Sequence, residues 1–318
     1  MYLPRHYDTD RPTPLILAFH AHREDADEMN EKTRFTNWRF NPTFAVHYLQ
    51  ARRKRWLAGE DHAEMESPDF NYTRTVLDYT MNHYCIDVDR VFLVGESEGS
   101  GFANILACDP RFSYHFAGMA LSGVHAHGEL DLDFCKDARL PMPVLEAHGT
   151  IDERASYWGD RKRRLLPVPA WIQRWVRRNG CDPVARRGYL NSERFQWDRY
   201  TCQGQLGYVE HIKLSEWEHL WPTQDVWGRG LSFSRPALWF LQRWVRPGNL
   251  TIPLKAGNNF DTFGHERAIK YILSGNDGTP SSNRIPGNNR TWGNHTTLGN
   301  HATWRNDTIF SNDTILAN

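Results

Sequence analysis

The sequence of 318 residues has no excess of charge of either sign and no long apolar segment. Lysine plus arginine and aspartate plus glutamate number 38 each, so the formal net charge is zero. This balance argues against a nucleic acid or a membrane surface as a partner held by bulk electrostatics. No apolar run approaches the length of a membrane span, and the first residues contain no apolar core of a signal peptide. We therefore expect no membrane segment and no membrane partner.

Cysteine is scarce, and its spacing matches no zinc-binding template. The five cysteines are Cys85, Cys108, Cys135, Cys181 and Cys202. An odd number leaves one thiol unpaired or paired with a cysteine outside this chain. We expect no metal and no organic cofactor.

Short apolar runs alternate with longer amphipathic stretches from about residue 13 to residue 247. This alternation is typical of a mostly parallel sheet flanked by helices. The pattern predicts strands at 14–20, 44–48, 91–95, 116–122, 142–148 and 208–214, and helices at 69–84, 99–108, 169–179 and 234–245. We therefore assign residues 1–247 to one α/β domain.

Beyond residue 247 the composition changes to asparagine, threonine and glycine. Asparagine recurs every six residues from Asn288 to Asn318. One interpretation is a hexapeptide β-solenoid, but so few units bury little core, so we favour a disordered, low-complexity tail over 248–318. Asn-x-Thr sequons favour a secreted, glycosylated chain; they occur at Asn71, Asn249, Asn289, Asn294, Asn306 and Asn312.

One short motif carries chemistry. Gly95-Glu96-Ser97-Glu98-Gly99 follows a continuous apolar strand and opens a helix of small residues. A sharp strand-to-helix turn lifts a serine hydroxyl clear of the sheet, and the glycines remove side chains that would clash there. The backbone N–H of residue 98 then faces the oxyanion that develops during acyl transfer. The motif predicts Ser97 as a nucleophile and an α/β-hydrolase fold.

A serine needs a base and an orienting acid, which follow it in this fold in the order Ser, Asp/Glu, His. Asp152 lies just after the strand at 142–148, and His219 lies just after the strand at 208–214. We predict Asp152 as the acid and His219 as the base. His148 is a competing base that we interpret as structural, because it precedes Asp152. Glu153 is the alternative acid.

The second oxyanion donor is expected from the loop after the first strand, as the backbone N–H of Ala21 or His22, beside that of Glu98. A carboxylate next to the nucleophile opposes an oxyanion if it turns inward. We therefore expect the Glu98 side chain to point to solvent. Trp158 and Trp221 are candidates for stacking on an aromatic ring or a sugar, and packing in the core is the alternative for each.

Taken in order, the motifs resemble fungal feruloyl esterases of the type C branch, which are related to polyhydroxybutyrate-depolymerase-like esterases. The resemblance covers about residues 2–246. It is carried by Tyr7-Asp8, Pro14-Leu15-Ile16, Tyr84-Cys85-Ile86-Asp87, Gly95-x-Ser97-x-Gly99-x-Gly101-Phe102, Leu106-Ala107-Cys108-Asp109, His148-Gly149-Thr150-x-Asp152, Tyr157-x-Gly159, Trp171-x-x-x-Trp175, Gly180-Cys181 and His219-x-Trp221-Pro222.

The resemblance implies a secreted enzyme that releases ferulic and related hydroxycinnamic acids from plant cell-wall arabinoxylan. It implies that Ser97, Asp152 and His219 form a catalytic triad. It also implies disulfides Cys181–Cys202 and Cys108–Cys135, with Cys85 pairing to a cysteine upstream of Met1. We expect the printed sequence to be truncated at its N-terminus, without the signal peptide, that cysteine and the first strands.

The chain departs from the family pattern at two places near the nucleophile. His20-Ala21 stands where the family has His-Gly, and Glu98 stands where it has a small residue. Paired aspartates before the helix leading to Tyr84 are also reduced to Asp69. We expect a monomeric esterase. An acetyl-xylan or polyester esterase is one rival interpretation, and an inactive hydrolase acting at most as a binding module is the other.

Overall fold

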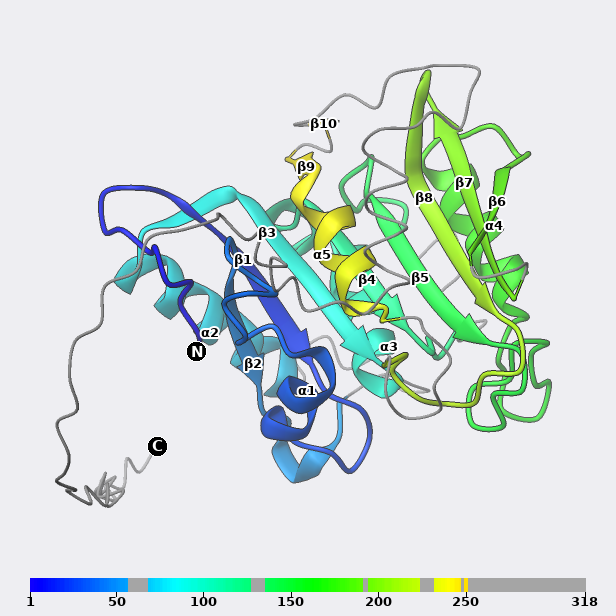
Figure 1. The fold of residues 1–318 in the computed structure, drawn as a ribbon, viewed down its shortest axis with the longest axis horizontal. Coiled ribbons are helices and arrows are strands. Elements are labelled where there is room, and N and C mark those ends of the chain that lie inside the picture. Colours follow the sequence, from blue (N-terminus) through cyan, green and yellow to red (C-terminus); the bar gives the residue numbers. More distant parts are fainter. Residues whose placement is uncertain (57–67, 127–134, 191–193, 224–231, 247–248, 251–318) are drawn as a thin grey trace, which may run out of the picture. The chain divides into compact units, whose positions relative to one another are not determined.

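A computed structural model describes residues 1–56, 68–126, 135–190, 194–223, 232–246 and 249–250. Within them an eight-stranded sheet has the order β2-β1-β3-β4-β5-β8-β7-β6 (Figure 1). Its strands are β1 Thr13–Phe19, β2 Ala45–Leu49, β3 Ile86–Glu96, β4 Gly118–Ser122, β5 Val144–Gly149, β6 Arg186–Leu190, β7 Phe195–Cys202 and β8 Gln205–Leu214. The strands from β2 to β8 in this order are parallel, whereas β7 and β6 are antiparallel additions at one edge.

The helices are α1 Ala26–Thr33, α2 Pro68–His83, α3 Glu98–Cys108, α4 Val168–Arg178 and α5 Ser234–Gln242. Two short 3₁₀ turns cover Arg52–Lys54 and Ser113–His115, and β9 Trp244–Val245 pairs with β10 Asn249–Leu250. Each predicted strand and helix is confirmed within a few residues at its ends. The structure adds α1, β6 and β7, which the pattern did not predict.

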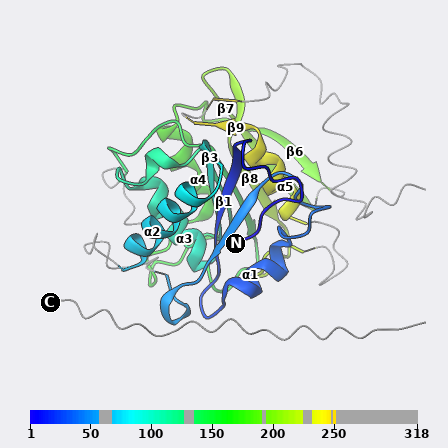
Figure 2. The same cartoon turned by 90° about the vertical axis from the view of Figure 1, so that its left-hand side faces the viewer.

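Two apolar cores lie on the two faces of the sheet, because successive strand residues point to opposite sides. Leu17 packs in one core with residues of α2, α3 and α4, including Phe102 and Trp175. Its neighbour Ala18 packs in the other core with residues of α1 and α5, including Met29. Figure 2 shows α1 and α5 on one side of the sheet and the other three helices on the opposite side. The fold is therefore a three-layer α/β/α arrangement.

The carboxyl ends of the parallel strands meet at one edge of this sheet. β1 continues outward to β2, whereas β3 continues in the opposite direction to β4, so the strand order reverses between β1 and β3. Open α/β sheets bind ligands outside the carboxyl ends of the strands at such a reversal. Ser97 follows β3 at this point, next to the loop that begins at His20.

Both disulfides implied by the resemblance are present. Cys108, the last residue of α3, is bonded to Cys135, and Cys181, just after α4, is bonded to Cys202 at the end of β7. Cys85 is a half-buried free thiol. Its pairing with an upstream cysteine stays a prediction. The predicted tail, apart from Asn249–Leu250, lies outside the described residues.

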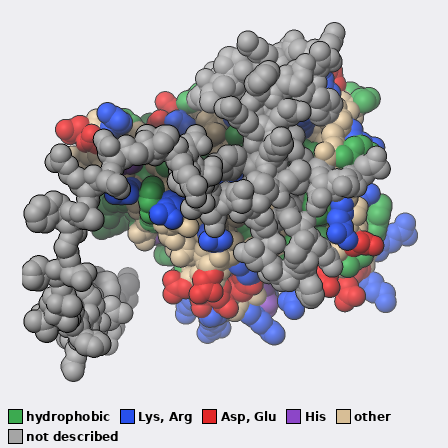
Figure 3. Space-filling model, viewed as in Figure 1, with side chains coloured by type: hydrophobic (Ala, Val, Ile, Leu, Met, Phe, Trp, Pro, Cys, Tyr) green, Lys and Arg blue, Asp and Glu red, His purple; other side chains and the backbone are tan. Residues whose placement is uncertain are grey.

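The described helices are all too short or too polar to cross a membrane. On the face shown in Figure 3, acidic and basic side chains of the described residues lie beside one another. This mixture agrees with the equal numbers of acidic and basic residues in the sequence.

Candidate active site

Ser97 occupies a strained turn between β3 and α3. Its φ of 54° and ψ of −118° lie in a region that non-glycine residues rarely adopt, at a cost of about 1–3 kcal/mol. The turn is tight because α3 starts against the end of β1: a Cβ on Gly99 would lie 2.3 Å from the Phe19 carbonyl oxygen. The Ser97 N–H donates to the Ser122 carbonyl at 2.9 Å, which ties the turn to β4. The glycine-flanked turn predicted from the sequence is thus present.

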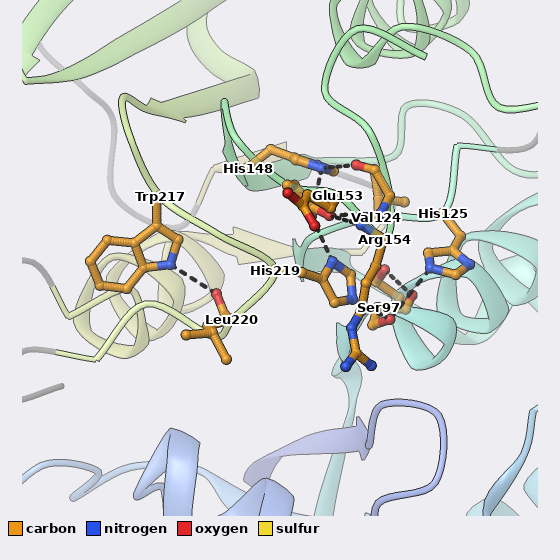
Figure 4. A network of polar contacts seen from close by, with 12 residues as sticks. Ser97, Val124, His125, His148, Glu153, Arg154, Trp217, His219 and Leu220 are labelled. Carbon is orange, nitrogen blue, oxygen red and sulfur yellow. Dashed lines mark hydrogen bonds and ion pairs between the residues drawn. The ribbon is translucent and has the colours of Figure 1, made fainter. Parts of the chain in front are cut away.

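Three side chains from three strand ends form a continuous hydrogen-bonded chain (Figure 4). His219 Nε2 lies 2.7 Å from Ser97 Oγ, and His219 Nδ1 lies 2.6 Å from Asp152 Oδ2. Asp152 follows β5 and His219 follows β8, as predicted. If His219 Nδ1 donates to the carboxylate, Nε2 is the free acceptor for the serine proton. This geometry can activate Ser97 as a nucleophile.

The loops that carry Asp152 and His219 are tied to each other by hydrogen bonds. Ile151 N–H donates to the Trp217 carbonyl at 3.2 Å, and Glu216 N–H donates to Thr150 Oγ1 at 2.9 Å. The Trp217 indole N–H also donates to the Leu220 carbonyl at 3.1 Å, closing the turn around His219 (Figure 4). Asp152 and His219 are therefore held as one unit.

Asp152 is held in its ionised form. Burial raises the pKa of its carboxyl, but contacts with His148 and His219 outweigh burial and hold the pKa well below its usual range. Its other oxygen, Oδ1, accepts from the backbone N–H groups of Arg154 at 2.8 Å and Ala155 at 2.7 Å. The alternative acid, Glu153, is exposed. The structure therefore brings Asp152, and not Glu153, to the histidine.

His148 lies behind Asp152, in a buried ionic cluster. Its Nε2 is 3.2 Å from Asp152 Oδ2, and its Nδ1 is 2.9 Å from Glu146 Oε1. Burial opposes the charged imidazole, but the two carboxylates outweigh burial and raise the pKa of His148 to about 10. Burial also raises the pKa of Glu146, yet His148 and His211 hold it below its usual value. A protonated His148 has no lone pair to act as a base, in agreement with its interpretation as structural.

His125 is a site residue that the sequence reasoning missed. Its Nε2 lies 3.4 Å from Ser97 Oγ, and its ring centroid lies 6.0 Å from that of His219. It follows β4 by three residues, at the same edge of the sheet as Ser97 (Figure 4). A polar residue just after a parallel strand was the only signal in the sequence that could have found it.

The predicted oxyanion donors lie on either side of the strand reversal. Ala21 and His22 follow β1, and Glu98 is the first residue of α3, where N–H groups have no partner within the helix. The prediction for the Glu98 side chain was wrong. The side chain is 11% exposed, against 9% for the whole residue, and its carboxylate contacts His22 Nδ1 at 3.2 Å instead of pointing to solvent. A nearby backbone donor explains the inward turn, because Trp56 N–H donates to Glu98 Oε2 at 3.0 Å.

The two candidate stacking residues have opposite environments. Trp221 is only 2% exposed and packs against Phe35 and Phe233, with its indole N–H donating to Ser234 Oγ at 2.9 Å. Its ring is part of the core, so the prediction that it stacks on a substrate was wrong. Trp158 is 64% exposed on the loop after β5, where its ring lies against Tyr157 and 5.5 Å from Lys213 Nζ, so its stacking on a substrate stays a prediction.

Two curated relatives match the sequence. A bifunctional acetylxylan esterase/xylanase of Neocallimastix patriciarum is 22% identical over 259 residues, covering 78% of this chain and 33% of that protein. Feruloyl esterase D of Neurospora crassa is 24% identical over 187 residues, covering 57% of this chain and 59% of that protein. The chain thus spans between a third and three fifths of the length of these relatives. The resemblance to feruloyl esterases is confirmed, and the other matching relative is named an acetylxylan esterase/xylanase. No family model matches the chain.

Among solved structures, an acetyl xylan esterase from Aspergillus awamori superimposes with a TM-score of 0.57 at 13% identity, covering 75% of this chain and 92% of that one. At 13% identity this match supports the fold alone. The sheet, the turn at Ser97 and this match agree: the protein has the α/β-hydrolase fold.

Proposed function

We propose that this protein is a serine carboxylic-ester hydrolase acting on esters of plant cell-wall xylan. The proposal rests on one observation above all, the unbroken contact from Ser97 Oγ through His219 to Asp152 at the carboxyl edge of the sheet. That arrangement is the one a Ser-His-Asp triad requires.

In the first step His219 Nε2 takes the proton of Ser97 as Oγ attacks the ester carbonyl carbon. Asp152 holds the imidazole in the right tautomer and stabilises its charged form. The backbone N–H groups of Glu98 and of Ala21 or His22 hold the developing oxyanion. His219 then gives its proton to the departing alcohol, leaving an acyl-Ser97 ester. Water attacks this ester in the same way, releases the acid and restores Ser97.

The finer proposal is a feruloyl esterase that releases ferulic and related hydroxycinnamic acids from arabinoxylan. It is supported by the motif resemblance and by the match to feruloyl esterase D. The exposed ring of Trp158 is the candidate surface for an aromatic acyl group.

Acetyl-xylan ester hydrolysis is the second candidate. The relative that matches the larger share of this chain is named an acetylxylan esterase/xylanase, which favours this alternative. An acetyl group also needs no aromatic platform, so this candidate does not depend on Trp158.

A secreted location is part of the proposal. Two disulfides among the described residues support it, because disulfides persist in oxidising compartments. The proposed partners are cell-wall polysaccharide esters alone.

The test is a substrate panel with the purified full chain: methyl ferulate, acetylated xylan and a hydroxybutyrate ester, each with Ser97→Ala as the control. We expect turnover of methyl ferulate or acetylated xylan that disappears in the variant. Preference for methyl ferulate supports the finer proposal, and preference for acetylated xylan supports the second candidate. Preference for the hydroxybutyrate ester would contradict both, and a folded protein inactive on all three would contradict the enzyme itself.

A further inference from the structure

Two glutamates flank Ser97, and both turn back into the protein. Glu96 is 4% exposed and Glu98 is 9% exposed. Burying a carboxylate is costly unless it is hydrogen-bonded or paired with a cation. The partners of these two side chains therefore indicate why acids are tolerated beside the nucleophile.

Glu96 reaches the loop that carries His219. Its Oε1 accepts from the backbone N–H of Trp221 at 2.9 Å, and Trp221 is two residues after the histidine. Its Oε2 lies 2.9 Å from Lys32 Nζ on α1, a cation that Glu96 shares with Glu24. Glu96 thus joins the turn at Ser97 to the loop of the proposed base.

Glu98 reaches the opposite side, where the proposed oxyanion loop lies. One oxygen contacts His22 Nδ1 at 3.2 Å, and the other accepts from the backbone N–H of Trp56 at 3.0 Å. The Arg55 guanidinium Nε lies 3.9 Å away. As the first residue of α3, Glu98 also places negative charge at a helix N-terminus, where it is favourable.

The loop after β2, which Glu98 contacts at Trp56, is also hydrogen-bonded to His20. The Trp56 indole N–H donates to the His20 carbonyl at 3.0 Å, and Ala51 N–H donates to His20 Nε2 at 3.1 Å. Arg23 N–H donates to the Lys54 carbonyl at 2.8 Å. The segment from Ala51 to Trp56 is therefore held by Glu98, His20 and Arg23, and the last two of these border Ala21 and His22.

We propose that Glu96 and Glu98 are positioning residues, each of which fixes one half of the site around Ser97. Glu96 fixes the loop of the base through Trp221, and Glu98 fixes the loop of the oxyanion donors through His22 and Trp56. The inference rests on the proposed esterase function. Neither carboxylate takes part in bond making, because each is engaged by donors outside the reacting centre.

The test compares alanine and glutamine at both positions. Glutamine keeps an oxygen that accepts the backbone N–H, whereas alanine removes it. The substrate is 4-nitrophenyl acetate, whose small acyl group makes little use of the surrounding surface. Glu31→Ala, an exposed glutamate of α1, is the matched control. Thermal unfolding and near-ultraviolet circular dichroism establish that each variant is folded.

We expect Glu98→Ala to lower kcat about 30-fold with KM within about 3-fold, because a misplaced oxyanion donor acts in the transition state. Glu98→Gln stays within about 5-fold of the wild type in kcat. We expect Glu96→Ala to shift the acid limb of the pH profile of kcat/KM, because it frees the loop that carries His219. We expect Glu98→Ala to lower the plateau of the same profile and to leave the acid limb in place. Equal loss in glutamine and alanine variants, or no loss in either, would overturn the proposal.

A second measurement does not depend on catalysis. Amide hydrogen exchange, resolved by residue, reports the N–H groups of Trp56 and Trp221 directly. We expect Glu98→Ala to speed exchange at Trp56 and Glu96→Ala to speed it at Trp221, each about 10-fold or more, with protection kept in the glutamine variants. Unchanged exchange in the alanine variants would overturn the positioning role even if the enzyme is active. Absence of ester turnover in the wild type with these exchange effects present would instead count against the proposed function.

Discussion

Two histidines lie within reach of the Ser97 hydroxyl, and they differ in their distance from Ser97 Oγ. His219 Nε2 is 2.7 Å from Ser97 Oγ, and His219 Nδ1 is hydrogen-bonded to the ionised Asp152. His125 is 3.4 Å away, a long contact for a hydrogen bond. A base needs both a short contact to the nucleophile and a partner that stabilises its charged form.

This difference predicts unequal losses for the two histidines. We expect His219→Gln to reduce kcat/KM about 10,000-fold or more, as for a triad member. His125→Gln should cost no more than about 10-fold, the worth of one weak hydrogen bond. Steady-state kinetics on a small ester measure both. A larger loss in His125→Gln than in His219→Gln would show that His125, and not His219, is the base.

His148 predicts a specific dependence of stability on pH. Its pKa is raised from the usual 6.5 to about 10 in the folded protein, so its stabilisation is complete below pH 6.5. The contribution then falls as pH rises from 6.5 to 10 and is lost above that. We expect the free energy of unfolding of the wild type to decline over this window, and the decline to be smaller in His148→Gln.

The same variant is expected to lose about 3 kcal/mol at pH 6, because Glu146 and Asp152 are left without their buried cation. Denaturant unfolding at several pH values measures both effects. His83→Gln, at an exposed histidine of α2, is the control. A His148 variant that keeps the wild-type slope would show that the imidazole is not charged in the folded state.

At the scale of elements, the turn at Ser97 depends on the close approach of α3 to β1. We expect Gly99→Ala to cost about 3 kcal/mol or more, because its Cβ would lie 2.3 Å from a backbone oxygen that has no room to move. Gly180→Ala is the control: its φ is +63°, but nothing lies within 4 Å of its Cβ, so only backbone strain of about 1–2 kcal/mol remains. Equal costs for the two, measured by denaturant unfolding, would contradict this account of the motif.

The elements also show what the sequence could predict. Strands β1 and β3 contain continuous apolar runs, and β8 alternates between apolar and polar residues. These patterns predicted the strands and the loops after them, and with them Ser97, Asp152 and His219. The antiparallel β6 was not readable, since Arg186–Leu190 begins with two arginines and has no apolar alternation. α1 buries only Met29 and Thr33, although its capping pair Asp25 and Glu28 was visible in the sequence.

Contacts between distant segments account for the remaining errors. The direction of the Glu98 side chain depends on Trp56 and His22, and the burial of Trp221 depends on Phe35 and Phe233. Such contacts join residues far apart in the chain, and no local pattern reports them. His125 was missed for the same reason, because its partner Ser97 is 28 residues away.

For the molecule as a whole, the disulfides act on the unfolded chain. The pair Cys108–Cys135 has a sequence separation of 27, and closing a loop of that length contributes about 3.5 kcal/mol. We expect Cys108→Ala/Cys135→Ala to lower the free energy of unfolding by about that amount. Cys85→Ala, at the free thiol, should change it by less than about 1 kcal/mol. A double variant as stable as the Cys85 variant would contradict this role.

We propose Ser97 as the activated nucleophile of this protein. The most direct measurement is mass spectrometry of the full chain after reaction with a fluorophosphonate, which phosphonylates an activated serine. We expect one adduct per chain, on the peptide that contains Ser97, with no adduct in Ser97→Ala and greatly slowed labelling in His219→Gln. A folded wild-type chain that takes up no label, or that carries it on another serine, would show that Ser97 is not the activated nucleophile.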